Sequence, residues 1–404
     1  MMRWRASAAR SLASAACVAV AMALTLSVGG CDADDGSVPS PPPGNTTSAE
    51  PDPSAVIGSS GAEGEFGDSS TGRQPLPGPT SADLYMTVLP LTPLWELDRR
   101  GQYIKAVSDE MIVNDQVNVP RIVAYTPDAT YFYPLGSLMI AQQVFIVGDT
   151  VFFGYSRDGG TDYSFVRWTP QSGESSVLWS GDHYIEYAVL GETLFYADLE
   201  PGNPCLRAMD VSDPTRPSGD HEVACFSGSP ELGWFETDYS TLTFLTRDED
   251  SMCYDAHSVT DQEAVVDHPV DDCLLQATAS GEYLAWTEGP PDASLDYYKT
   301  EFFISRGTST QPMGTAETGS PQWCGGQLYW TEAYGNVRLW TWDPATNEAH
   351  VAFRAKRDDP VLGGDPHLYH LTCQPGGRLV FFLSGSEGRE QYFTNKPLTW
   401  KVDL

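Results

Sequence analysis

The cysteines are the residues whose spacing most clearly indicates chemistry. Cys205 and Cys225 are separated by the same interval as Cys253 and Cys273, so the second pair repeats the first further along the chain. Cys324 and Cys373 follow later. These six cysteines allow 15 pairings, between which spacing alone does not choose. The sequence contains no CxxC motif, so disulfides are favoured over a cysteine-based metal site or catalytic thiol.

Two histidines have a spacing that is known from zinc sites. His367 and His370 form an HxxH pair, which would place both rings on one face of a helix. The residues that follow read as a strand, on which positions i and i+3 face opposite sides. We therefore predict no metal site at this pair.

Acidic loops are the remaining candidates for ion binding. Asp158 and Asp162 flank a Gly-Gly-Thr stretch, and Asp248 and Asp250 flank a glutamate. Carboxylates of this kind bind Ca²⁺, although neither segment matches an EF-hand loop. Solvated acidic turns are the favoured interpretation, and Ca²⁺ is the one cofactor that the sequence leaves open.

Motifs for the commoner enzymes are absent from the sequence. It contains no GxSxG nucleophile elbow, no P-loop and no dinucleotide fingerprint. Carboxylates are too numerous to single out a glycosidase pair. We therefore predict no catalytic residue.

The N-terminus has the pattern of an export signal. Residues 1–30 contain three arginines and no acidic residue, and an apolar run covers 12–28. This run ends in Val28-Gly29-Gly30-Cys31, which resembles the lipobox of bacterial lipoproteins. The resemblance implies cleavage before Cys31 and lipid attachment to its thiol, with localisation in the cell envelope. An ordinary signal peptide and a retained membrane anchor are the alternatives.

The next segment, 31–83, is predicted to be a disordered linker. It is rich in Pro, Ser and Gly, and Phe66 is its only aromatic residue, so it has little apolar surface to bury. The whole chain carries 23 basic and 55 acidic residues, a formal net charge of −32. This charge excludes nucleic acid as a partner, and membrane contact is expected only through the lipid.

A repeated unit accounts for the remaining residues, 84–404. Six segments share a turn, then an apolar residue, and an aromatic residue two positions on; their aligned apolar residues are Val151, Leu194, Leu242, Leu284, Leu328 and Leu379. Successive copies follow at intervals of about 45 residues, which is the size of one four-stranded propeller blade. The first clear copy predicts strands at 141–147, 150–156, 165–169 and 175–179. The fold class is therefore all-β, a β-propeller.

The repeats resemble two propeller families. The segment 152–160, an apolar-aromatic strand followed by an Asp/Gly loop, resembles TolB-like propellers. Tyr329-Trp330-Thr331-Glu332 resembles the YWTD repeat, with Glu in place of the final Asp. Both resemblances imply an architecture and no particular activity.

The number of blades depends on residues 84–136. Strand-like runs at 84–89, 103–107 and 121–125 lack the turn signature of the other copies. We interpret them as a divergent seventh blade; a six-bladed ring with an N-terminal extension is the alternative.

The repeat also selects a disulfide pattern. The offset from Cys205 to Cys253 equals the local blade spacing from Leu194 to Leu242, so the first two cysteine pairs lie at equivalent positions, in a third strand and at the outer strand next to it. We predict the disulfides Cys205–Cys225, Cys253–Cys273 and Cys324–Cys373, the last between adjacent inner strands. A loop of about 20 residues gives such a bond roughly 3 kcal/mol of stabilisation.

Three functions are compatible with these features. The leading hypothesis is a monomeric, lipid-anchored binding or scaffold propeller whose partner is an envelope protein or glycan. The second is an envelope hydrolase or lyase that acts on sugar or peptide, which predicts carboxylates or histidines converging from the inner strands of several blades. The third is a purely structural envelope component.

Overall fold

The computed structural model describes most of the predicted repeat domain. The described residues are 87–88, 102–116, 120–135, 141–157, 162–182, 184–199, 203–213, 218–228, 231–247, 251, 253–270, 273–289, 300–316, 321–331, 338–354, 367–384 and 390–396. They belong to one compact unit, Asp52–Leu404. The signal segment, Cys31 and the whole linker 31–83 lie outside the described residues. The described part of the chain contains no helix with the length and hydropathy of a membrane span.

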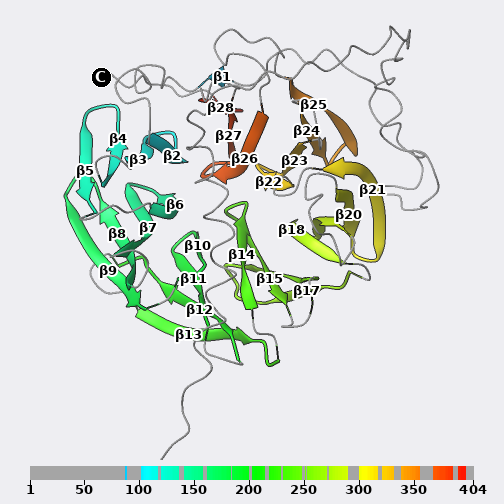
Figure 1. Cartoon of the computed structure of the whole chain (residues 1–404), viewed down its shortest axis with the longest axis horizontal. Helices are drawn as coiled ribbons and strands as arrows, with labels where there is room; N and C mark the ends of the chain where they lie inside the picture. Colours follow the sequence, from blue (N-terminus) through cyan, green and yellow to red (C-terminus); the bar gives the residue numbers. More distant parts are fainter. Residues whose placement is uncertain are drawn as a thin grey trace, which may run out of the picture. The chain divides into compact units, whose positions relative to one another are not determined.

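Seven four-stranded antiparallel sheets are arranged in a ring, which makes the domain a seven-bladed β-propeller (Figure 1). Blade 1 comprises β2 (Gln102–Val107), β3 (Ile112–Gln116), β4 (Arg121–Tyr125) and β5 (Thr130–Pro134). Blade 2 comprises β6 (Ala141–Val147), β7 (Thr150–Arg157), β8 (Asp162–Thr169) and β9 (Glu174–Gly181). Blade 3 comprises β10 (Tyr187–Leu190), β11 (Thr193–Asp198), β12 (Cys205–Asp210) and β13 (Ser218–Cys225). Blade 4 comprises β14 (Glu231–Thr237), β15 (Thr241–Arg247), β16 (Asp255–Thr260) and β17 (Val266–His268).

The remaining three blades follow in chain order. Blade 5 comprises β18 (Leu274–Ser280), β19 (Tyr283–Glu288), β20 (Thr300–Arg306) and β21 (Ser309–Ala316). Blade 6 comprises β22 (Gln322–Cys324), β23 (Gln327–Thr331), β24 (Arg338–Asp343) and β25 (Glu348–Arg354). Blade 7 comprises β26 (His367–Gln374), β27 (Arg378–Ser384), β28 (Glu390–Thr394) and, at its outer edge, β1 (Thr87–Val88).

The strand at the outer edge of blade 7 corrects one prediction. The run at 84–89 was assigned to the divergent blade, but its strand β1 pairs with β28, with Thr87 opposite Thr394 and Val88 opposite Phe393. Blade 1 instead uses Ile112–Gln116 and Thr130–Pro134 as its second and outer strands. The C-terminal blade has three strands of its own, and the N-terminal strand covers the edge that β28 would otherwise expose.

Burial decreases from the second strand of a blade to its outer strand. In blade 3, the central residues of β11, Leu194 to Ala197, are all buried, whereas β13 is mostly exposed. A strand that is covered on both faces by neighbouring blades needs a continuous apolar sequence, which explains the aromatic runs of the repeat. The tryptophans Trp286, Trp330, Trp340 and Trp342 are buried between blades, as predicted.

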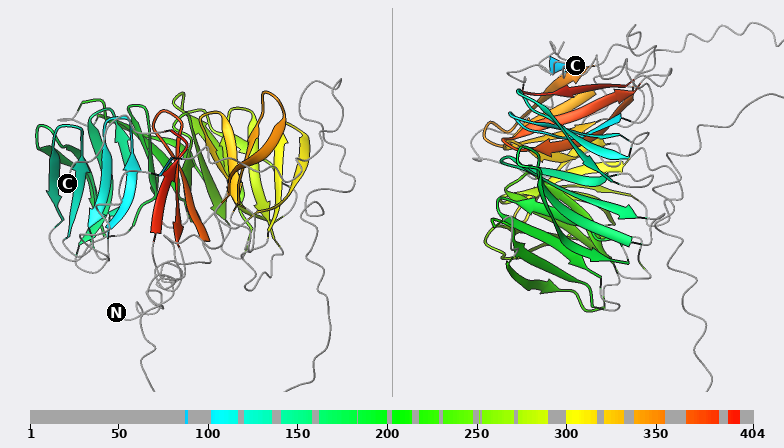
Figure 2. Two further views of the ribbon diagram at one scale, coloured as in Figure 1. Left: turned by 90° about the horizontal axis from the view of Figure 1, so that it is seen from above. Right: turned by 90° about the vertical axis from the view of Figure 1, so that its left-hand side faces the viewer.

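The direction of the strands gives the ring two distinct ends. Every blade is an antiparallel sheet whose strands run across the thickness of the ring, which Figure 2 shows from the side, and successive blades enter at the same end of it. We call the end where the inner strands begin the entry face and the end where they turn into the second strands the turn face. The third strand of each blade runs in the same direction as the inner strand, so it begins at the entry face and ends at the turn face.

Three disulfides are present, and they are the three pairs that the repeat predicted. Cys205–Cys225 joins the third and outer strands of blade 3, and Cys253–Cys273 joins the segment before β16 to the segment before β18. Cys324–Cys373 joins the inner strands of blades 6 and 7.

Replacing both Cys324 and Cys373 with Ala should lower the free energy of unfolding by about 4 kcal/mol, because their bond closes the longer loop, of 49 residues. The same change at Cys205 and Cys225, which close a loop of 20 residues, should cost about 3 kcal/mol. Urea titration of both double variants measures the difference. An equal loss, or a larger one at Cys205 and Cys225, would contradict the loop-length explanation.

Candidate functional site

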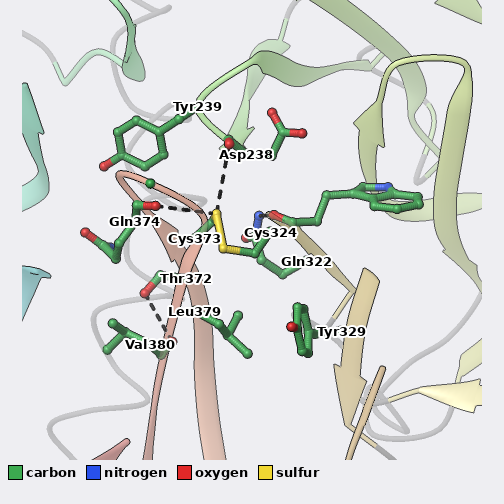
Figure 3. Close-up of a disulfide and its surroundings, with 12 residues drawn as sticks. Asp238, Tyr239, Gln322, Cys324, Tyr329, Thr372, Cys373, Gln374, Leu379 and Val380 are labelled. Atoms are coloured by element: carbon green, nitrogen blue, oxygen red, sulfur yellow. Dashed lines mark hydrogen bonds between the residues drawn. A yellow bond between two sulfur atoms is a disulfide. The ribbon is translucent and has the colours of Figure 1, made fainter. Parts of the chain in front are cut away.

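One turn of blade 4, which contains Asp238 and Tyr239, lies at the turn face next to the disulfide Cys324–Cys373 (Figure 3). Tyr239 lies at the repeat position that Gly148 occupies in blade 2, and both residues have positive φ, 69° and 60°. The Tyr239 ring packs against Phe145 of blade 2 and against the apolar cluster of blades 6 and 7. A non-glycine residue in this conformation costs about 1 kcal/mol or more. The tyrosine thus bridges opposite sides of the ring.

Polar bonds hold this turn in place. Asp238 Oδ1 accepts the backbone N–H groups of Ser240 and Thr241 at 2.8 and 2.7 Å, and Oδ2 accepts the Ser280 hydroxyl of blade 5 at 2.6 Å. The disulfide lies beside it, with Cys373 Sγ 4.0 Å from the Asp238 carbonyl oxygen (Figure 3). The turn face near the axis is therefore occupied by structural contacts.

A pocket lies at the entry face, between blades 2 and 3. It is small, with a volume of about 10 Å³, which is room for about one water molecule, and it is partly open to solvent. Six of its ten lining residues are aromatic: Tyr155, Tyr163, Phe165, Trp179, Tyr184 and Tyr187. The rest are Gln142, Gly154, Ser164 and Ile185, so no lysine, arginine or carboxylate from the described residues lines it.

Two glycines make room for the rings of this pocket. Tyr187 Oη accepts the Gly154 N–H and donates to the Gln143 carbonyl oxygen, and a Cβ at Gly154 would lie 2.8 Å from the Tyr187 ring. A Cβ at Gly181 would lie 2.5 Å from the outer edge of the Trp179 ring. Tyr187 thus forms a fixed floor, and Trp179 and the Tyr163–Tyr184 pair, whose centroids are 5.8 Å apart, form the half-buried walls.

A carboxylate lies directly behind the pocket. Glu186 accepts hydrogen bonds from the Tyr184 hydroxyl and, at 3.0 Å, from Gln143 Nε2. Burial raises the pKa of Glu186, and these two bonds oppose that shift. Its side chain lies over β14 of blade 4, where a Cβ at Gly233 would be 3.6 Å from Glu186 Cγ.

Blade 4 contributes a second carboxylate from its inner strand. Burial, followed by repulsion from Glu186, raises the pKa of Glu236 to about 7. The strand is irregular between Gly233 and Glu236, and Trp234 within this stretch has φ 55° and a 41% exposed side chain. Glu236 and the exposed indole of Trp234 lie on β14, and Glu186 lies immediately before β10, so the two carboxylates come from neighbouring blades.

One arrangement in blade 4 has the hydrogen bonds of a catalytic triad. Thr246 Oγ1 lies 2.9 Å from His257 Nε2, and His257 Nδ1 lies 2.8 Å from Asp267 Oδ1. Thr246 is 3% exposed, however, and the imidazole packs against the rings of Phe226 and Phe244. No substrate reaches this hydroxyl, so the three residues are a structural network between strands.

Of the histidines and aspartates singled out from the sequence, the structure describes the positions of only some, and it places these on two different blades. His367 and His370 lie on strand β26, as predicted. Asp158, Asp248 and Asp250 lie outside the described residues, and Asp162 begins β8. Within the described ranges, one group offers three metal-ligand atoms within 4.8 Å, Cys205, Glu222 and Cys225, but both sulfurs are in a disulfide.

Sequence reasoning missed the aromatic pocket and the two glutamates. Their signal is positional, because connections from an outer strand to the next inner strand all lie at the entry face. The segment Tyr184-Ile185-Glu186-Tyr187 occupies one such connection and unites polar and aromatic side chains. Assigning the strands of each blade from the sequence would have placed this segment at the entry face and marked it as a candidate site.

Comparison with known proteins supports the fold. No family model and no curated protein matches the chain. The propeller domain of the Trilobed protease from Pyrococcus furiosus is similar, with TM-score 0.51 and 13% identity over 73% of this chain and 95% of that one. It is described as having an open velcro topology, whereas β1 pairs with β28 here.

Two longer peptidases are also similar in structure. A prolyl endopeptidase matches with TM-score 0.51 and 13% identity over 74% of this chain and 48% of its own. A post-proline cleaving enzyme from Rickettsia typhi matches with TM-score 0.51 and 10% identity over 77% and 55%. The chain thus spans about half of each enzyme, and at these identities the likeness concerns the propeller fold alone. The TolB-like and YWTD-like resemblances stay predictions.

Asp115 provides a test of the electrostatics at the entry face. It is fully buried at the end of β3, and Oδ2 accepts the Ala141 N–H of blade 2 at 3.0 Å. Burial raises its pKa to about 6 from 3.8, against the opposing effects of Lys105 and of that bond. The folded protein therefore binds more protons than the unfolded chain between these values, and stability falls as pH rises through this window.

Asp115→Asn should remove this dependence and keep an acceptor for Ala141. We compare the free energy of unfolding of the variant with that of the unsubstituted chain at each pH. This difference should be about 2 kcal/mol more favourable to the variant at pH 7.5 than at pH 4.5. Urea titrations at both pH values measure this difference. Asp115→Ala is the control, and it should be less stable than Asn by about 1 kcal/mol at each pH because the bond is lost. If this difference does not change with pH, burial does not raise the pKa of Asp115.

Proposed function

We propose that the chain is a binding propeller of the cell envelope, anchored through lipid on Cys31, that takes its ligand at the entry face. The observation that carries the binding role is the contrast between the two ends of the ring. Tyr239 and the disulfide Cys324–Cys373 occupy the turn face near the axis, whereas the entry face has a pocket with half-buried aromatic walls. Aromatic pockets with few polar groups are characteristic of ligand sites.

The anchor rests on the sequence at the N-terminus. Val28-Gly29-Gly30-Cys31 follows an apolar run and precedes a long Pro- and Ser-rich segment. Two or three acyl chains on Cys31 would hold the protein stably at a membrane.

Cys31→Ser should abolish acylation and release the protein from the membrane fraction. Intact-mass spectrometry of the mature protein measures the acyl groups and the new N-terminus. Cys17→Ser, within the apolar run, is the matched control and should leave the mature mass unchanged. A mature N-terminus elsewhere than residue 31, or an unlipidated Cys31, would refute the anchor and leave the binding role standing.

An envelope hydrolase or lyase is the second candidate, and one observation favours it. Glu186 and Glu236 come from neighbouring blades, and a carboxyl with a pKa of about 7, as at Glu236, suits general acid–base chemistry near neutral pH. Sugar or peptide would be the substrate class.

Arrays of envelope glycans and peptides, probed with the purified chain, distinguish these candidates. We expect at least one ligand to be retained unchanged, with about tenfold weaker binding in Trp179→Ala because an aromatic wall of the pocket is lost. Phe132→Ala, which removes an exposed ring from β5, is the control and should bind normally. Cleavage of the retained ligand, lost in Glu236→Gln, would select the enzyme instead. Retention of no ligand would contradict both.

A further inference from the structure

A cluster of metal-ligating side chains lies on the outer two strands of blade 3. In the described part of the chain it is the one group whose three ligand atoms lie within 4.8 Å of one another: Cys205 Sγ, Cys225 Sγ and a carboxylate oxygen of Glu222. The two sulfurs form a disulfide, so in the oxidised protein they do not offer thiolates to a metal. Reduction would leave two thiols beside a carboxylate, which is a ligand set that Zn²⁺ accepts.

The pairing of β12 with β13 explains why these three side chains meet. Cys205 lies directly opposite Cys225. One extra residue in β13, Val223, then shifts the register, so that Glu222 lies opposite Arg207. Without this bulge, positions 222 and 225 would face opposite sides of the sheet, because side chains alternate along a strand. The bulge places Glu222 on the same face as both cysteines, where its Oε2 lies 3.8 Å from Cys225 Sγ.

The backbone holds the two cysteines together independently of the disulfide. Their Cα atoms are 4.0 Å apart, and just beyond the pair the Phe226 N–H donates to the Pro204 carbonyl oxygen at 2.9 Å. Two thiolates on one Zn²⁺ lie about 4 Å apart, because each Zn–S bond is about 2.3 Å long. Rotation about the two Cα–Cβ bonds brings the sulfurs to that separation. Reduction thus leaves a pair of ligands that the strands have already positioned.

The disulfide of this cluster is accessible to a reductant. Thiol–disulfide exchange begins when a thiolate attacks one of the sulfurs, so its rate depends on access. Cys225 is exposed at the end of the outer strand, and the Glu222 side chain is 63% exposed. Cys324 and Cys373, in contrast, are 1% and 5% exposed. A dithiol should therefore reduce the bond in blade 3 while the protein is folded and leave the bond between blades 6 and 7 intact.

Arg207 shares the carboxylate of the cluster but has two further anionic partners. Its Nη1 lies 3.5 Å from Glu222 Oε1 and 3.9 Å from Asp198 Oδ2, and its Nε lies 3.1 Å from Asp220 Oδ1. Glu222 can therefore turn an oxygen towards a metal while Asp198 and Asp220 still neutralise the guanidinium. A positive charge on the face of the cysteines also favours their thiolate forms.

We propose that Cys205, Cys225 and Glu222 form a Zn²⁺ site in the reduced protein, with a water molecule as the fourth ligand. A dithiol reductant transfers two electrons and two protons to the disulfide and becomes a disulfide itself. Zn²⁺ then displaces the two thiol protons and binds both sulfurs, and the carboxylate is the third protein ligand. The site goes beyond the proposed function, since it uses no residue of the aromatic pocket.

Zn²⁺ titration of the reduced, folded chain tests the proposal. The chain is treated with dithiothreitol, freed of it by anaerobic gel filtration and titrated calorimetrically, with circular dichroism to show that it stays folded. We expect one tight site that the oxidised chain lacks, and thiolate charge-transfer absorption when Co²⁺ replaces Zn²⁺. Equal Zn²⁺ binding by the reduced and oxidised chains, or release of these thiols only on unfolding, would overturn the proposal.

Variants then locate the site. Glu222→Gln keeps both thiols and should weaken Zn²⁺ binding by about tenfold, because an anionic ligand is lost. Glu192→Gln, which changes another exposed glutamate of blade 3, is the matched control and should bind normally. Cys205→Ser combined with Cys225→Ser should abolish the site that depends on reduction. Unchanged binding in Glu222→Gln, or the same site in the double cysteine variant, would place the metal elsewhere and refute the assignment.

Discussion

The fold depends on hydrogen bonds and a disulfide that cross from one blade to the inner strands of the next. No blade buries both of its faces alone, so each must be fixed against two neighbours. Tyr187 of blade 3 bonds the Gly154 amide of blade 2, and the Thr243 hydroxyl of blade 4 accepts the Ala279 amide of blade 5 at 2.7 Å. Gln374 of blade 7 accepts the Val107 amide of blade 1 at 3.1 Å. The ring is thus closed by directional contacts in addition to apolar packing.

The same contacts explain why the two ends of the ring differ. At the turn face the crossing groups meet close to the axis, where Gln322 donates to the Thr237 carbonyl oxygen of blade 4 and the disulfide joins blades 6 and 7. At the entry face the crossing groups lie between adjacent blades, as with Asp115 and Ala141. The aromatic pocket accordingly lies at a blade interface, where large rings surround a glycine.

Much of the architecture was predictable because each repeat must bury the same apolar positions against its neighbours, so the same pattern recurs along the sequence. Neighbouring blades are copies of one unit and pack against each other, so equivalent positions recur in each copy. The apolar-aromatic second strands and the equal offsets of the disulfide cysteines follow from this repetition. The assignment of 84–89 was wrong because so short an edge strand has no periodicity of its own, and its partner β28 lies near the other end of the chain. The site was unpredictable for a related reason: Trp179, Tyr184 and Glu186 flank a connection, where no hydrophobic period applies and only the closed ring brings them together.

The pairing of β1 with β28 has a mechanical consequence. The first described strand of the domain is attached by two residue pairs at the outer edge of the last blade, far from the bonds around the axis. A pull on the preceding segment would load those two pairs one after the other, as in peeling, before any force reached a blade. β1 would therefore detach at low force, while the blades and the pocket between blades 2 and 3 kept their shape.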